Sequence, residues 1–218
     1  GNETKLKPKP MIKIGKLPMI VHIMQIYSKF KINEFIIAGG YKYNFIKDYF
    51  NKKKFKKFDI KIINTGTNSM TGGRIYKLRK FIDSPSFMVT YGDGLANVNI
   101  QKLLKFHKNN KKLGTMTIVR PPARWGHVTL KKNLVLKFEE KNQLNEGWIN
   151  GGFFVFNYRI FNYINDKNSM LEVEPINKLV KNKELNAFKH QGFWQCMDTL
   201  RDKNFLNNLL KRRKAPWI

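Results

Sequence analysis

An acidic residue between two glycines is the strongest chemical signal in the sequence. Asp93 follows the β-rich run at residues 89–91 and is flanked by Gly92 and Gly94. Ligands of open α/β sheets gather at the carboxyl ends of strands, so Asp93 would project into the expected site. The flanking glycines would let a bulky phosphate or a metal ion approach the backbone closely. An ordinary turn carboxylate is the alternative interpretation.

A second acidic candidate, Asp198, stands after the aromatic pair at residues 193–194 and just before a segment of helical periodicity. Taken alone, it is better explained as the N-cap of that helix, because an aspartate there accepts hydrogen bonds from free amides of the first turn. Two carboxylates that converge from distant segments would instead suit Mg²⁺, which takes one or two protein carboxylates together with substrate phosphates. Asp93 and Asp198 are therefore the candidate metal pair.

Two short segments supply cations for phosphate groups. Lys9 stands between two prolines, and a restrained backbone reduces the ordering cost when the ammonium binds a triphosphate. At residues 70–74 a glycine pair precedes Arg74 at an apparent helix start, where free amides and a guanidinium favour phosphate oxygens. A solvated loop in a lysine-rich protein explains the first segment equally well, and the second is a weak motif without company.

Residues 138–141 and 148–152 offer groups that suit a phosphorylated sugar. They contain hydroxyl-binding carboxylate and amide groups, a lysine for the phosphate, and glycines that permit close approach. The alternatives are a solvated strand end for the first segment and a plain turn or β-bulge for the second. Neither alternative is excluded by the residues alone.

The elements that must position these residues alternate between short apolar runs and longer segments of helical period. This pattern predicts an α/β fold with a mostly parallel sheet flanked by helices. Helices are expected after Pro18, around residues 75–81 and 103–107, and over residues 199–210. Strands are expected at residues 35–38, 58–63, 86–91 and 115–119. Residues 127–130 and 134–138 predict a hairpin, a small antiparallel addition over the sheet.

Length and composition limit the class of protein. A chain of 218 residues can bury one sizeable core, which predicts a single compact domain. No apolar run approaches the roughly 18 residues that span a bilayer, and no basic-then-apolar leader opens the sequence. The single cysteine, Cys196, cannot form an intrachain disulfide. We therefore expect a cytoplasmic protein with no membrane partner.

The formal net charge of +27 would suit a nucleic-acid partner, because such proteins gain affinity by neutralising phosphates. Arginine supplies only 8 of the 42 basic residues, and the lysines are scattered rather than gathered with aromatics into one face. We therefore expect no nucleic acid as partner, although the positive field should attract anionic substrates. A basic nucleic-acid binder is the alternative, and it would retain DNA at salt well above physiological levels.

Placed in order, these segments resemble the glucose-1-phosphate cytidylyltransferases of the nucleotidyltransferase family. The resemblance covers nearly the whole chain, and the matching stretches are residues 7–11, 69–74, 91–94, 149–154, 192–195, 197–202 and 215–217. The stretches Met-Thr-Gly-Gly-Arg and Gly-Phe-Trp-Gln look closer to cytidylyltransferases than to thymidylyl-, uridylyl- or guanylyltransferases. The resemblance implies a Rossmann-like fold and the formation of CDP-glucose and pyrophosphate from CTP and glucose 1-phosphate.

The resemblance also implies roles for individual residues. Mg²⁺ would be held by the carboxylates of Asp93 and Asp198. The contacts to the nucleotide would come from Lys9, Thr71, Gly73, Arg74 and Gly92, of which Lys9 and Arg74 would neutralise the triphosphate. The contacts to glucose 1-phosphate would come from Glu140, Lys141, Asn150 and Gly151. The sugar phosphate would attack the α-phosphorus of CTP in line, without a protein nucleophile, so catalysis would come from positioning and charge neutralisation.

The organisation implied by the resemblance is one nucleotidyltransferase domain over residues 1–218. Residues 1–120 would form the nucleotide side, and residues 121–218 the sugar-phosphate side with the C-terminal helix. A homo-oligomer is a further expectation. The alternatives are an enzyme with another triphosphate (UTP, dTTP or GTP) or another sugar, and a truncated homologue without catalysis.

The sequence departs from the family's pattern at several places. The family opens with a buried strand and a glycine-rich loop, Gly-x-Gly-Thr-Arg, that wraps the nucleotide, and this sequence begins just after that loop. Residues 14–18 displace one lysine of the family's Ile-Gly-Gly-Lys-Pro, and residues 50–58 are short and rich in lysine. Asn142 and Cys196 stand where proline is usual.

We expect the 218-residue chain to turn over CTP very weakly or not at all, because half of the nucleotide pocket would be absent without that strand and loop. The measurement is CTP-dependent release of pyrophosphate in the presence of glucose 1-phosphate. Robust turnover by a chain of this length would contradict the expectation.

Overall fold

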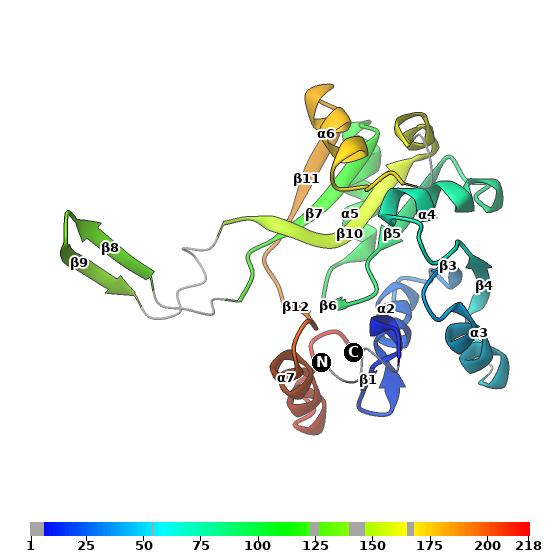
Figure 1. The fold of residues 1–218 in the computed structure, drawn as a ribbon, viewed down its shortest axis with the longest axis horizontal. Helices are drawn as coiled ribbons and strands as arrows, with labels where there is room; N and C mark the ends of the chain where they lie inside the picture. Colours follow the sequence, from blue (N-terminus) through cyan, green and yellow to red (C-terminus); the bar gives the residue numbers. More distant parts are fainter. Residues whose placement is uncertain (1–6, 54, 123–126, 140–146, 165–167) are drawn as a thin grey trace.

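The computed structural model of the protein describes residues 7–53, 55–122, 127–139, 147–164 and 168–218, in which strands and helices alternate (Figure 1). The strands are β1 (Lys13–Ile14), β2 (Leu17–Pro18), β3 (Glu34–Gly39), β4 (Asp59–Asn64), β5 (Ser86–Thr90), β6 (Gly94–Ala96), β7 (Gly114–Val119), β8 (His127–Lys131), β9 (Leu134–Glu139), β10 (Ile149–Asn157), β11 (Leu185–His190) and β12 (Trp194–Cys196). The α-helices are α2 (Met19–Ser28), α3 (Tyr43–Lys52), α4 (Thr71–Leu78), α5 (Ile100–Asn110), α6 (Glu174–Lys181) and α7 (Leu200–Lys211). The 3₁₀ helices are η1 (Lys9–Met11), η2 (Arg79–Phe81) and η4 (Tyr158–Tyr163).

The central sheet has the strand order β11-β7-β10-β5. Strand β11 is parallel to β7, whereas β10 is antiparallel to both β7 and β5, so β5, β7 and β11 share one direction. Strands β3 and β4 form a separate parallel pair. The predicted α/β class is confirmed, and the four predicted strands correspond to β3, β4, β5 and β7.

Strand β10 is the central element that the sequence pattern did not predict, and α3, α6, β11 and β12 were not predicted either. Its first residues have the composition of a turn or bulge, and the pairing with β7 does shift register between Asn150 and Phe154. Gly152 has a φ of 78°, a conformation that favours glycine. The β-bulge that the sequence offered as an alternative is present, and it lies within the central strand β10.

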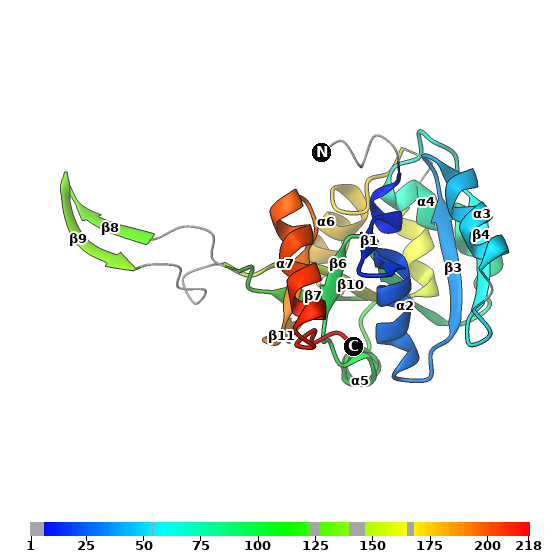
Figure 2. The ribbon, with the colours of Figure 1, turned by 90° about the horizontal axis from the view of Figure 1, so that it is seen from below.

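The buried half of β10 divides its side chains between two cores. Phe153 and Val155 join a cluster that contains residues of α2, α5 and α7. Phe154 and Phe156 point to the opposite face and join a cluster with residues of α4, η4 and α6. Alternate side chains of a strand face opposite sides, so a continuous apolar run indicates a strand covered on both faces. Figures 1 and 2 show helices on both sides of this sheet.

Helix α2 joins the central sheet to the β3–β4 pair. Pro18 is its N-cap, as the sequence predicts, and eight of its ten residues are buried. Its Tyr27 packs against Phe35 of β3 and Phe153 of β10, whereas Val21 and Met24 lie in a third cluster with residues of β3 and α3. A helix that is apolar nearly all round is typical of a buried position. No helix in the described part of the chain is long and apolar enough to cross a membrane.

The predicted hairpin exists as β8 and β9, but its expected place over the sheet is wrong. The two strands pair antiparallel in a ribbon that projects away from the body (Figures 1 and 2). Val128, Leu136 and Phe138 are 50%, 56% and 60% exposed. The sheet does not cover these apolar side chains. Their presence in the sequence therefore did not indicate that the ribbon packs on the sheet.

The C-terminal segment is anchored on α2 through a buried hydrogen bond. Trp217 is 1% exposed, and its Nε1 donates to Nδ1 of His22 at 3.3 Å, while Nε2 of His22 donates to the carbonyl of Ile14 at 2.9 Å. Burial lowers the pKa of His22, although the bond to Ile14 opposes this shift. A neutral ring with its proton on Nε2 satisfies both partners. His22 is thus held in the core by two hydrogen bonds.

Replacement of Trp217 by phenylalanine should lower the free energy of unfolding by about 1–2 kcal/mol, because Nδ1 of the buried His22 loses its donor. The substitution keeps an aromatic ring against Phe193, which stacks on Trp217 at 5.5 Å. Trp148→Phe is the matched control, since Trp148 is only partly buried against Arg120 and should change stability by less than about 0.5 kcal/mol. Urea denaturation measures both, and equal losses would contradict this account.

Candidate active site

Two short paired strands bring the predicted acidic residues together. Strand β6 begins directly after Asp93, and β12 ends two residues before Asp198. The strands are antiparallel with Gly94 opposite Cys196, and the amide of Met197 donates to the carbonyl of Asp93 at 2.8 Å. Backbone hydrogen bonds thus place two residues that are 105 positions apart (198 minus 93) in neighbouring loops.

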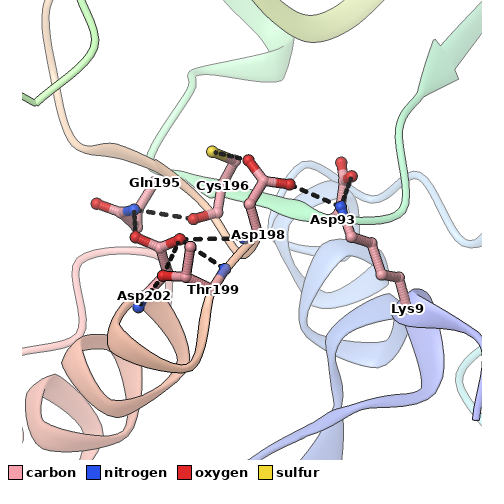
Figure 3. A network of polar contacts seen from close by, with 7 residues as sticks. All are labelled: Lys9, Asp93, Gln195, Cys196, Asp198, Thr199 and Asp202. Carbon is pink, nitrogen blue, oxygen red and sulfur yellow. Dashed lines mark hydrogen bonds and ion pairs between the residues drawn. The ribbon is translucent and has the colours of Figure 1, made fainter. Parts of the chain in front are cut away.

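Lys9 reaches both acidic residues from η1. Its Nζ lies 2.6 Å from Oδ1 of Asp198 and 3.4 Å from Oδ2 of Asp93 (Figure 3). The approach depends on Gly92, since a Cβ at that position would lie 2.5 Å from Cγ of Pro10. Any side chain at residue 92 would therefore push η1 away from the acidic pair.

The three charged groups are accessible to a ligand. The side chains of Lys9, Asp93 and Asp198 are 38%, 34% and 48% exposed. Burial by itself would lower the pKa of Lys9, but the hydrogen bond to Asp198 and the charge of Asp93 outweigh it and raise this pKa. The cluster combines one ammonium with two carboxylates, so it retains a surplus of negative charge within a strongly basic protein.

The N-cap interpretation of Asp198 is wrong, because Thr199 caps α7. The side chain of Thr199 accepts from the amide of Asp202, and the carboxylate of Asp202 accepts from the amide of Thr199, which together form a capping box. The side chain of Asp198 instead points to Lys9, and the thiol of Cys196 donates to its Oδ2 at 3.1 Å (Figure 3). Burial, reinforced by Asp198, raises the pKa of Cys196 to about 12, so the thiol keeps the proton that it donates.

The donor set of this cluster fits a hard divalent cation. Asp93 and Asp198 offer carboxylate oxygens from two loops, and both already converge on one cation, the ammonium of Lys9. Among the residues that the structure describes, no group of three or more histidine, cysteine, aspartate or glutamate side chains could hold a metal ion. A site with two carboxylates leaves positions for phosphate oxygens and water, as Mg²⁺ prefers.

The predicted nucleotide-binding segment at the start of α4 is held by other parts of the chain. Arg74 lies over Gly40, where a Cβ would be 1.7 Å from its Nη1, and this Nη1 donates to Oγ1 of Thr65 at 2.9 Å. Burial lowers the pKa of Arg74. The hydroxyl of Thr71 donates to Oε2 of Glu172 at 2.6 Å. A role of Arg74 in neutralising the triphosphate stays a prediction.

Gly73 likewise contacts the protein itself, since its amide donates to the carbonyl of Ser169 at 3.0 Å. The neighbouring Gly72 is needed for this packing, because a Cβ there would lie 2.8 Å from the same carbonyl oxygen. The glycine pair therefore permits a close contact between two backbone segments. From the sequence, the free amides of this segment were expected to favour phosphate oxygens instead. A nucleotide role for Thr71 and Gly73 stays a prediction.

The predicted sugar-phosphate residues are only partly described. Glu140 and Lys141 lie outside the described residues. Asn150 accepts from the amide of Gly152 at 2.8 Å, and the carbonyl of Gly151 accepts from Nε1 of Trp194 at 2.8 Å. Their contact with a sugar stays a prediction.

Sequence reasoning missed the carboxylates that organise this region. Glu172 accepts hydrogen bonds from Thr71 and from the hydroxyl of Tyr91, which lies two residues before Asp93. No local pattern marks Glu172. Asp202 could have been recognised, because Thr199-x-x-Asp202 has the spacing of a capping box.

Comparison with known proteins finds relatives that match nearly the whole chain. The chain is 39% identical to the glucose-1-phosphate cytidylyltransferase of Salmonella typhimurium (strain LT2), over 100% of this chain and 93% of the relative. It is 34% identical to the probable glucose-1-phosphate cytidylyltransferase of Bacillus subtilis (strain 168), over 96% of this chain and 91% of the relative.

Solved structures share the fold at lower sequence identity. A putative glucose-1-phosphate thymidylyltransferase from Bacillus anthracis superposes with a TM-score of 0.75 at 18% identity, over 99% of this chain and 89% of the other. HddC from Yersinia pseudotuberculosis superposes with a TM-score of 0.73 at 21% identity, over 94% and 90%. The fold is thus Rossmann-like, as predicted. Residues 4–202 match the model of the nucleotidyl transferase family, and the chain belongs to this family.

Proposed function

We propose that this protein transfers a cytidylyl group from CTP to α-D-glucose 1-phosphate, giving CDP-glucose and pyrophosphate. The observation that carries the proposal is the convergence of Lys9, Asp93 and Asp198 at one accessible point. This arrangement of a cation and two carboxylates suits the phosphates of a triphosphate and a divalent metal ion. The likeness to glucose-1-phosphate cytidylyltransferases over the whole chain supports the choice of CTP and glucose 1-phosphate.

Members of this family generally use a divalent metal, and we propose Mg²⁺ for this chain. Asp93 and Asp198 would hold it through carboxylate oxygens. When bound, Mg²⁺ supplies positive charge beside the phosphates at which charge develops during the transfer. The protein's own contribution is to keep the two loops in register through the β6–β12 pairing, so the carboxylates do not need to be gathered when the substrates bind.

Lys9 would bind the phosphates of CTP in exchange for part of its contact with the acidic pair. Its ammonium is a compact charge with three donors, and η1 holds its backbone next to the loop of Asp93. Arg74, Thr71, Gly73 and Gly92 are proposed to line the nucleotide side. Glu140, Lys141, Asn150 and Gly151 are proposed to bind glucose 1-phosphate.

The reaction needs no side chain as nucleophile, because a phosphate oxygen of the sugar attacks the α-phosphorus in line with the leaving pyrophosphate. The thiol of Cys196 contacts Asp198, and burial raises its pKa to about 12, which disfavours the thiolate that a nucleophile needs. The rate enhancement would then come from the alignment of the two phosphates and the neutralisation of their charge.

The choice of nucleotide is tested with a panel of triphosphates. With glucose 1-phosphate and Mg²⁺, the protein expressed from its complete reading frame should form CDP-glucose at least about tenfold faster than it forms the UDP, dTDP or GDP sugar. Chromatography of the nucleotide sugars measures the rates. Equal or faster use of another triphosphate would instead assign a different nucleotidyltransferase activity.

The acidic pair is tested by Asp93→Ala and Asp198→Ala in the same protein. Each should lower metal-dependent kcat by at least about 100-fold, since one of the two carboxylates that hold the metal beside the phosphates is lost. Asp83→Ala is the matched control, because Asp83 is exposed in the loop before β5, at the end of the strand opposite Asp93, and it should leave turnover unchanged. If an acidic-pair variant kept full turnover, that residue would not belong to the site.

A further inference from the structure

A buried carboxylate stands directly behind Asp198. The side chain of Asp202 accepts three hydrogen bonds on Oδ2, from the amide of Asp198 at 3.1 Å and from the amide and hydroxyl of Thr199 at 2.9 and 2.8 Å (Figure 3). Its Oδ1 accepts from Nε2 of Gln195 at 3.1 Å. Asp202 is 7% exposed, so its charge depends on these donors for stabilisation.

A capping box explains only part of this arrangement. It requires the reciprocal bonds between Thr199 and Asp202, which begin α7. The bond from the amide of Asp198 is additional, and it has a geometric consequence. The amides of residues 198 and 199 belong to the two peptide groups on either side of the Asp198 Cα, and both donate to the same oxygen. One buried atom therefore restrains the backbone of Asp198 from both sides.

The restraint extends to the side chain of Asp198. With its backbone held, the carboxylate is oriented by two further partners, the thiol of Cys196 on Oδ2 and the ammonium of Lys9 on Oδ1. Gln195 and Cys196 both belong to β12, whose pairing with β6 also places Asp93. Asp202 thus links the start of α7, strand β12 and the acidic pair in one network.

We propose that Asp202 is a positioning residue for metal binding, which holds Asp198 in the orientation that it needs beside Asp93. The inference rests on the proposed function, because it assumes that the acidic pair binds the metal of the reaction. Asp202 itself touches neither metal nor substrate. Partners that orient a metal ligand from behind change metal affinity or activity by about 10–100-fold when they are removed.

The test measures how strongly metal promotes CTP binding, without glucose 1-phosphate and therefore without turnover. Isothermal titration calorimetry gives the Kd of CTP with Mn²⁺ and with no metal, for the protein expressed from its complete reading frame. Asp202→Ala should reduce the gain in affinity due to Mn²⁺ by at least about tenfold, and it should leave the metal-free Kd within about twofold. It should also raise the Mn²⁺ concentration that half-activates turnover.

A second cap provides the matched control for general destabilisation. Asn99 accepts from the amide of Lys102 at 2.8 Å at the start of α5, a helix of 11 residues compared with 12 in α7. Asn99→Ala removes a helix-capping acceptor of the same kind and should lower the melting temperature while keeping the Mn²⁺ gain. Asp202→Asn should restore most of the gain in affinity, because the asparagine carbonyl can replace Oδ2. The asparagine NH₂ group would then take the place of Oδ1, and the side-chain amide of Gln195 would flip so that its oxygen accepts from it. If Asp202→Ala does not fold, Asp202→Ser takes its place, since a serine hydroxyl is too short to reach both amides.

Different outcomes would contradict the positioning role of Asp202 and the proposed cytidylyltransferase activity. An unaltered Mn²⁺ gain in Asp202→Ala, or an equal loss in Asn99→Ala, would overturn the positioning role while the enzyme assignment stands. Absence of any Mn²⁺ gain in the unsubstituted protein, together with absence of CDP-glucose synthesis, would overturn the proposed function itself.

Discussion

The pairing of β6 with β12 is the contact on which the site depends. Each strand has only three residues, yet their backbone hydrogen bonds place the loops of Asp93 and Asp198 side by side. A pairing this short is marginal on its own, and it persists because Leu95 and Ala96 are fully buried in the core that also contains Phe153 and Leu206. Burial of the apolar residues of β6 therefore positions two exposed carboxylates.

The negative charge of the acidic pair, Asp93 and Asp198, opposes the positive net charge of the whole chain. A chain with a formal net charge of +27 attracts anionic substrates from a distance, but a binding site with only positive charges would not attract a metal cation. The acidic pair reverses the sign locally, and Lys9 neutralises part of it. The buried Asp202 accepts hydrogen bonds from the backbone amides of Asp198 and Thr199 and from the side chain of Gln195, and these contacts hold it behind Asp198.

The sequence predicted elements well where the apolar pattern was local and regular. Helix α2 follows Pro18 as expected, and α7 begins after its cap at Thr199. The prediction missed β10, because a run of apolar residues without alternation indicates burial on both faces but not the direction of the chain, and its bulge has the composition of a turn. The place of the β8–β9 ribbon was wrong because the exposed apolar side chains of an isolated ribbon do not specify what lies beside them.

For the site, residue types and spacing made Lys9, Asp93 and Asp198 candidates among many charged side chains, and the order of the family-like segments selected them from the alternatives. Residue types could not show that Thr71 and Gly73 contact Glu172 and Ser169. They also could not show that Asp202 lies behind Asp198. The chemical groups that a chain offers follow directly from its residue types. Distance between residues remote along the chain is set by strand pairing and packing of the whole core, and only the tertiary structure decides it.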